Sequence, residues 1–101
     1  MTIEILYFDG CPSYEALRAH LRELLAGAGV AVEIEVRRVD TVDAAERERF
    51  LGSPTVRIDG QDVEPGAAQR TDYGLKCRLY RTEAGLSGTP PDAWIVDAVA
   101  G

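Results

Sequence analysis

The chain is poor in the residues from which disulfide-rich domains and metal clusters are built. Among 101 residues it has only two cysteines and one histidine, with one tryptophan, two phenylalanines and one methionine. Two cysteines are too few for the disulfide framework of a small secreted domain. They are better interpreted as reactive or metal-binding thiols in a reducing compartment.

Basic charge and long apolar runs are also scarce. There are 11 Lys and Arg against 17 Asp and Glu, which gives a formal net charge of −6 and argues against nucleic acid as a partner. The start, Met1–Glu4, has no basic segment followed by an apolar run, so we expect neither a signal peptide nor a membrane span. These features predict a cytoplasmic protein with no membrane partner, and the length predicts one domain over residues 1–101.

Cys11 lies where a strand pattern ends and a helix pattern begins. Residues 2–8 are β-favouring, and from residue 14 onward apolar residues recur at steps of three and four, as on one face of a helix. We expect Cys11 at the N-cap and Pro12 at the first helical position. A thiol there meets free N–H groups and the positive end of the helix dipole, which favour thiolate and predict a nucleophile. The alternative is a small apolar cysteine that closes the strand.

The remaining patterns predict an α/β domain with a four-stranded mixed sheet. Residues 30–37 alternate between apolar and charged or small side chains, as an edge strand parallel to the first strand would. A short charged helix is expected over 40–51, and strands over 55–58 and 62–63 flank an Asp-Gly turn. Pro90 and Pro91 then start a last helix.

Two motifs together resemble the thioredoxin-like superfamily, and glutaredoxins in particular. They are Cys11-Pro12 at the start of the first helix and Ser53-Pro54-Thr55 before the third strand. The likeness extends from residue 1 to about residue 64. The chain is also similar to small bacterial thioredoxin-like proteins that are named alongside alkylmercury lyases, although we find no third ligand for lyase chemistry.

The resemblance implies a thioredoxin-like fold and a role for each residue of the two motifs. It makes Cys11 the nucleophile and Pro54 a cis-proline that lies against it. The residues expected to bind substrate are Pro12, Tyr14, Ser53 and Thr55. The backbone groups of Ser53 and Thr55 are expected to be free to pair with an extended substrate.

The sequence departs from the family at two places. A dithiol member has a second cysteine three residues after the first, where this chain has Tyr14. An insertion over about 65–90 precedes the last helix, and it contains Cys77 between Lys76 and Arg78. Positive neighbours favour a thiolate, so Cys77 is a candidate resolving thiol if the insertion folds back over the first helix. The alternative is a buried cysteine in an irregular strand.

Three functions follow, in order of preference. The first is a thiol-disulfide redox protein without a cofactor, acting on a thiol- or disulfide-containing protein or small molecule through Cys11, Pro54 and Cys77. The second is a binder of a soft ion such as Cu(I) or Hg(II), because two thiolates suit linear coordination. The third is a redox-inactive interaction module that keeps the fold alone.

Overall fold

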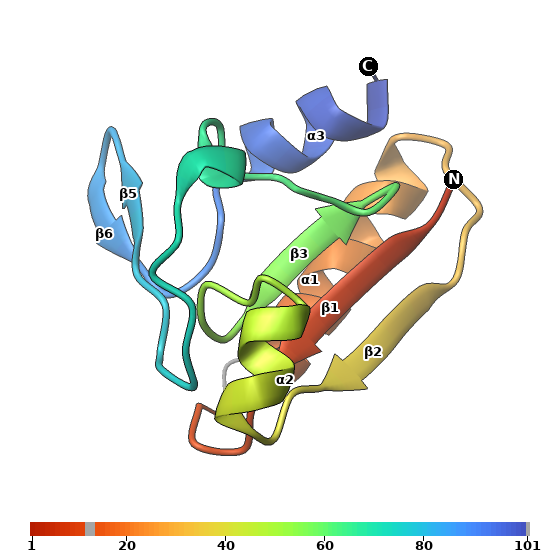
Figure 1. The fold of residues 1–101 in the computed structure, drawn as a ribbon. Helices are drawn as coiled ribbons and strands as arrows, with labels where there is room; N and C mark the ends of the chain where they lie inside the picture. The colour runs from red at the N-terminus through yellow and green to blue at the C-terminus, as the bar shows by residue number, and fades with distance from the viewer. Residues whose placement is uncertain (12–13, 101) are drawn as a thin grey trace.

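The computed structural model describes residues 1–11 and 14–100. These residues form one α/β domain (Figure 1). In chain order the elements are β1 (Ile3–Tyr7), α1 (Tyr14–Gly27), β2 (Ile34–Arg38), α2 (Val42–Arg47), β3 (Thr55–Ile58), β4 (Gln61–Asp62), the 3-10 helix η1 (Ala67–Gln69), β5 (Tyr80–Thr82), β6 (Gly85–Ser87) and α3 (Asp92–Ala100).

The main sheet has four strands in the order β2-β1-β3-β4. β2 is parallel to β1, with Ile34 opposite Ile3, whereas β3 is antiparallel to β1 and to β4. The predicted mixed sheet, with the charged strand β2 at its edge, is therefore confirmed. β5 and β6 form a separate antiparallel hairpin.

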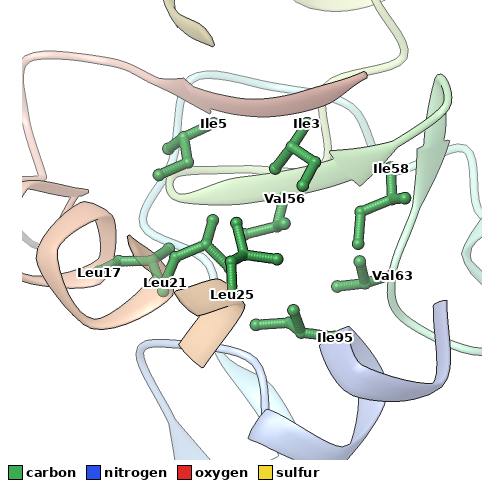
Figure 2. Close-up of a cluster of buried hydrophobic side chains, with 9 residues drawn as sticks. All are labelled: Ile3, Ile5, Leu17, Leu21, Leu25, Val56, Ile58, Val63 and Ile95. Atoms are coloured by element: carbon green, nitrogen blue, oxygen red, sulfur yellow. The ribbon is translucent and has the colours of Figure 1, made fainter. Parts of the chain in front are cut away.

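Helices cover both faces of the sheet, because β1 carries apolar side chains on both sides. Ile3 and Ile5 point into a core shared with α1, β3 and α3 (Figure 2). Leu6 points the other way, into a smaller cluster with Val39, Ala45 and Phe50 under α2. Burial of a large aliphatic side chain stabilises a fold by about 1.5–3 kcal/mol, so these two clusters hold the sheet between its helices.

Two predicted elements are shorter in the structure. The strand expected over 30–37 begins only at Ile34, because β1 starts at Ile3 and offers no partner backbone to residues 30–33. The helix expected over 40–51 begins after its N-cap Thr41 and ends at Arg47. Arg49 has a left-handed φ of 54°, which reverses the chain and lets the fully buried Phe50 enter the second cluster.

The predicted hairpin turn is tighter than expected. Asp59 and Gly60 have φ values of 52° and 80°, and Ile58 pairs directly with Gln61. Two consecutive positive φ values are typical of a two-residue type I′ turn, which suits an Asp-Gly pair. β4 therefore starts at Gln61, one residue before its predicted start.

The insertion is ordered and folds back along the sheet. It contains η1 and the β5–β6 hairpin, and between them residues 71–79 run beside the chain that leads into β3 (Figure 1). Ser53 and Cys77 form an isolated parallel bridge. This return path brings the second cysteine to the end of the sheet where β1 leads to Cys11.

Candidate functional site

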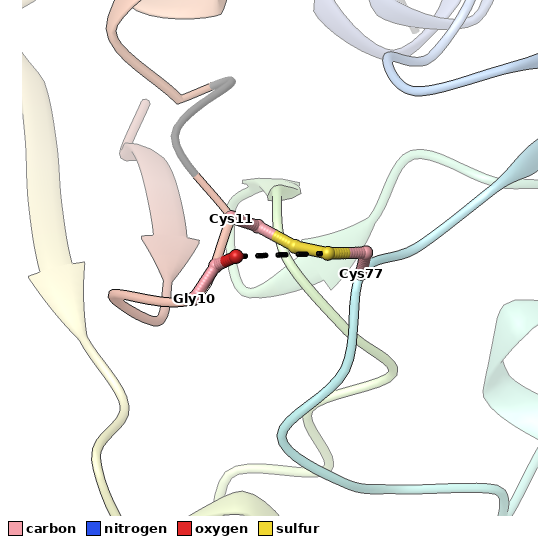
Figure 3. The surroundings of a disulfide bond; sticks show 3 residues. All are labelled: Gly10, Cys11 and Cys77. Carbon is pink, nitrogen blue, oxygen red and sulfur yellow. Dashed lines mark hydrogen bonds between the residues drawn. A yellow bond between two sulfur atoms is a disulfide. The ribbon is translucent and has the colours of Figure 1, made fainter.

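The two cysteines lie together although 66 positions separate them in the chain. Their Cα atoms are 5.7 Å apart and their sulfurs are joined (Figure 3). Bridging requires Cα atoms within about 7 Å, so the backbone alone allows the pair. Cys77 Sγ is also 3.9 Å from the Gly10 carbonyl oxygen, to which a Cys77 thiol would donate.

The surroundings of the two cysteines differ sharply. Cys11 is 3% exposed, and its backbone N–H donates to the Phe8 carbonyl at 3.2 Å. Cys77 is exposed. The predicted helix-capping role of Cys11 depends on Pro12, which, like Ser13, is outside the described residues; α1 itself is described from Tyr14.

The backbone groups of Ser53 are not free, contrary to the prediction. Its backbone N–H donates to the Lys76 carbonyl at 2.8 Å, and its carbonyl accepts from the Arg78 N–H at 2.9 Å. The insertion thus occupies the backbone groups that were expected to pair with an extended substrate. Ser53 as a whole is 1% exposed, and its Oγ has no hydrogen-bond partner among the described residues.

Gly52 lets the insertion approach this closely. It adopts φ +126°, and a Cβ added there would lie 2.9 Å from Arg78 Cβ and 3.0 Å from the Lys76 carbonyl oxygen. Any other residue would be strained at this φ and would push the Cys77 segment away. The glycine before Ser53 is therefore part of the site.

Arg78 anchors the segment on the side opposite Cys77. Its side chain is 1% exposed, and its two terminal nitrogens donate to the Asp62 carboxylate at 2.7 and 3.0 Å. Nη2 also reaches Glu64 Oε1 at 3.3 Å, and the guanidinium lies 4.3 Å from the Tyr80 ring centroid. A buried arginine needs such partners, because an unpaired buried charge is strongly destabilising.

The side chains around Pro54 are buried as well. Thr55 is 0% exposed; its Oγ1 donates to the Gly52 carbonyl at 2.6 Å and accepts from Arg78 Nη1 at 3.0 Å. The buried Tyr80 hydroxyl donates to the Pro54 carbonyl, and burial raises the pKa of Tyr80 above its ordinary value. The two hydrogen bonds of Oγ1 therefore commit the Thr55 side chain to internal contacts. The Ser53–Pro54 bond is cis, as predicted.

Tyr14 begins α1 and stacks on Tyr7 of β1. The ring centroids are 3.8 Å apart with an angle of 15° between the planes, and the half-buried Tyr14 packs against the main core. Its contacts are those of a side chain that joins α1 to the sheet. The predicted role of Tyr14 in substrate binding stays a prediction.

The charges near the cysteines are neutralised by partners. Lys76 Nζ lies 2.9 Å from Asp72 Oδ2, and Arg78 is paired as described, so both positive neighbours of Cys77 are bound to carboxylates. Asp9, two residues before Cys11, lies 3.1 Å from Arg38. The sequence argument that free positive charge stabilises a Cys77 thiolate therefore loses force.

Four residues that build the site were given no site role from the sequence: Gly52, Asp62, Glu64 and Tyr80. None belongs to the Cys11-Pro12 motif or to the Ser53-Pro54-Thr55 motif, and none is next to Cys77 in the sequence. A glycine directly before Ser-Pro was the one available signal, because glycine is typical of close backbone approach. The carboxylates of β4 and the following loop could not be paired with Arg78 before the insertion was located.

Comparisons with protein-family models, with curated proteins and with solved structures found no match. Within the described residues, no helix combines the length and apolar character needed to cross a bilayer. The same residues contain no cluster of three or more His, Cys, Asp or Glu side chains arranged to hold a metal ion.

Proposed function

We propose that this chain is a thiol-disulfide redox protein with a thioredoxin-like fold, whose redox pair is Cys11 and Cys77. The observation that carries the proposal is the 5.7 Å separation of their Cα atoms. Contacts independent of the sulfurs support that separation, namely the backbone pairing of Ser53 and the buried ion pair of Arg78.

The fold proposal is supported by the order of elements. A parallel strand-helix-strand unit is followed by an antiparallel hairpin and a closing helix, and Cys11 and Ser53-Pro54 lie in the loops before α1 and β3. The insertion is a departure from the family pattern. It supplies a second thiol to a chain that has Tyr14 where a dithiol member of the family has its second cysteine.

A distal pair of this kind would work by exchange. Two thiols held at bridging distance have a high effective concentration toward each other, so a disulfide forms intramolecularly in preference to one between chains. The electrons pass to an outside disulfide on oxidation and come from outside thiols on reduction. No cofactor is needed for this chemistry.

The test is equilibration of the full chain in buffers of reduced and oxidised glutathione, followed by alkylation of the remaining thiols and mass spectrometry. We expect a reversible monomeric disulfide in the native protein, with the equilibrium shifted strongly toward the dithiol in urea. Cys11→Ser and Cys77→Ser should each abolish it. A native protein that stays a dithiol at every ratio, or forms only dimers, would contradict the proposal.

The same juxtaposition of two sulfurs supports a second candidate function, the binding of a soft ion by two thiolates. Titration of the reduced protein with Cu(I) against a competing chelator tests it. Binding of one ion that requires both cysteines, in a protein that resists oxidation by glutathione disulfide, would favour this function over redox exchange.

A further inference from the structure

Building on the proposed redox function, we propose that Cys77, rather than Cys11, is the sulfur that exchanges with outside molecules, and that its partner is a low-molecular-weight thiol. Cys11 then acts from inside the protein on the sulfur of Cys77. This reverses the roles that the sequence motif assigns to the two cysteines.

The difference in burial between the two cysteines supports the first part of the proposal, that Cys77 is the sulfur that exchanges. Thiol-disulfide exchange is an attack by a thiolate on an accessible sulfur, so the rate depends on which sulfur the attacking group can reach. Cys11 is 3% exposed, whereas Cys77 is exposed. Both lie in one disulfide, and an incoming thiolate therefore meets Cys77 first.

The occupied backbone of Ser53 supports the second part of the proposal, that the partner is a low-molecular-weight thiol. An extended peptide would need the Ser53 N–H and carbonyl to add itself as a strand. Lys76 and Arg78 already hold both groups, at 2.8 and 2.9 Å. Vacating them would draw the Arg78 guanidinium, 1% exposed, out of its contacts with Asp62 and Glu64.

A small thiol needs none of these groups. It has only to reach the sulfur of one exposed residue, Cys77, and the segment that carries this sulfur stays in place during the reaction. The Arg78 anchor is independent of the disulfide, so it holds Cys77 beside Cys11 in the dithiol form as well. The insertion therefore acts as a built-in partner for Cys11 at the edge where the family would bind a peptide.

The reductive reaction has two steps. A thiolate RS⁻ attacks Cys77 Sγ, forms an RS–Sγ bond and breaks the bond between the cysteines, and Cys11 leaves as a thiolate. A second RS⁻ attacks the RS sulfur, which releases RSSR and leaves Cys77 as a thiolate. Two RSH molecules give up two electrons to the protein disulfide, and their two protons end on the two cysteines.

Oxidation runs the same steps backwards, with a low-molecular-weight disulfide RSSR as the oxidant. The Cys77 thiolate attacks RSSR and expels RS⁻, which gives a mixed disulfide at Cys77. The Cys11 thiolate then attacks Cys77 Sγ and expels the second RS⁻. Cys11 thus remains a nucleophile, but its target is the neighbouring sulfur.

Two single-cysteine proteins provide the first test. Reduced Cys11→Ser retains only Cys77, and reduced Cys77→Ser retains only Cys11; each is mixed with oxidised glutathione and its adduct is followed by mass spectrometry. We expect Cys77 to react faster by about tenfold in the native protein and the two rates to converge in urea, where burial no longer differs. A Cys11 that reacts as fast as Cys77, or faster, overturns the proposal.

The second test traps the intermediate in the oxidised wild-type chain. After brief exposure to glutathione, free thiols are alkylated and the chain is cut before aspartates, which separates a fragment starting at Asp9 from one starting at Asp72. Glutathione on the Asp72 fragment supports the assignment, and glutathione on the Asp9 fragment overturns it. Glutathione on the Asp9 fragment would leave the proposed redox function standing. A wild-type chain that forms no reversible disulfide would contradict both the redox function and the role given to Cys77.

The partner class has its own readout in the oxidised wild-type protein. An extended peptide with one central cysteine is compared with glutathione, with rates expressed per thiolate. We expect the two rates to agree within about threefold, because the Ser53 backbone gives the peptide no added binding. A peptide that reduces the protein more than about tenfold faster would show that the edge opens, and would overturn the assignment to a small thiol.

Discussion

Arg78, the residue that follows the exposed Cys77, forms a bidentate ion pair with Asp62. The guanidinium donates to both carboxylate oxygens at 2.7 and 3.0 Å, with the side chains 1% and 14% exposed. Because Arg78 follows Cys77 directly, this pair sets the position of the cysteine. Asp62 lies in β4, so the pair connects the insertion to the main sheet.

Arg78→Met should destabilise the protein by about 3 kcal/mol, because it removes one partner of a buried ion pair and takes both guanidinium donors away from the Asp62 carboxylate. Urea unfolding of the reduced protein measures the loss. Arg81→Met is the matched control, since Arg81 is exposed on β5. Equal free energies of unfolding for the two variants would show that the ion pair contributes little.

Gly52→Ala should weaken the attachment of the Cys77 segment. The added Cβ would lie 2.9 Å from Arg78 Cβ at a backbone φ of +126°, and overpacking of this kind costs about 1–3 kcal/mol. We therefore expect the equilibrium with glutathione to shift toward the dithiol by about tenfold, the equivalent of about 1.4 kcal/mol.

Gly74→Ala is the control for that shift. An added Cβ at Gly74 meets nothing within 4 Å, and its backbone N–H still donates to the Phe50 carbonyl at 3.0 Å. Its redox equilibrium should stay at the wild-type value. If Gly52→Ala also leaves the equilibrium unchanged, close approach at Gly52 is not what positions Cys77.

Tyr80→Phe should cost about 1–3 kcal/mol, because the Pro54 carbonyl loses its buried donor. Burial raises the pKa of Tyr80, so the stabilisation from its neutral hydroxyl is fully present below the unfolded pKa of about 10. It is lost as the pH rises through the folded pKa. The difference between wild type and Tyr80→Phe should therefore narrow in alkali.

Urea unfolding at neutral and alkaline pH measures this effect, with Tyr73→Phe as the control. Tyr73 is half-buried, and its ring is outside both core clusters. A Tyr80→Phe variant as stable as the control at neutral pH would contradict the role given to the hydroxyl.

Oxidation should stabilise the chain through the length of the loop that it closes. For a disulfide that spans 66 positions, the loss of chain entropy in the unfolded state corresponds to about 4 kcal/mol. The free energy of unfolding of the oxidised wild type should exceed that of the dithiol by this order. Cys77→Ser should match the dithiol, and equal stability of both redox forms would contradict the expectation.

Local patterns in the sequence determined the main sheet. The alternation after residue 30 and the stripe from Tyr14 follow from the periods of strand and helix, and the Asp-Gly pair specifies its turn by its own backbone preferences. Boundaries were less certain, because the start of β2 depends on where β1 begins and the end of α2 depends on the place of Phe50 in a core.

The site itself was decided by tertiary structure. The sequence marks Cys11 and Ser53-Pro54 as motif residues and Cys77 as a second thiol, but their mutual position depends on contacts between distant segments. Residues 76–78 pair with the Ser53 backbone only because Gly52 allows their close approach and the Asp62–Arg78 ion pair holds them there. Ion pairs and close backbone approaches have no periodic signature, so only the folded chain determines which cysteine is exposed and which is buried.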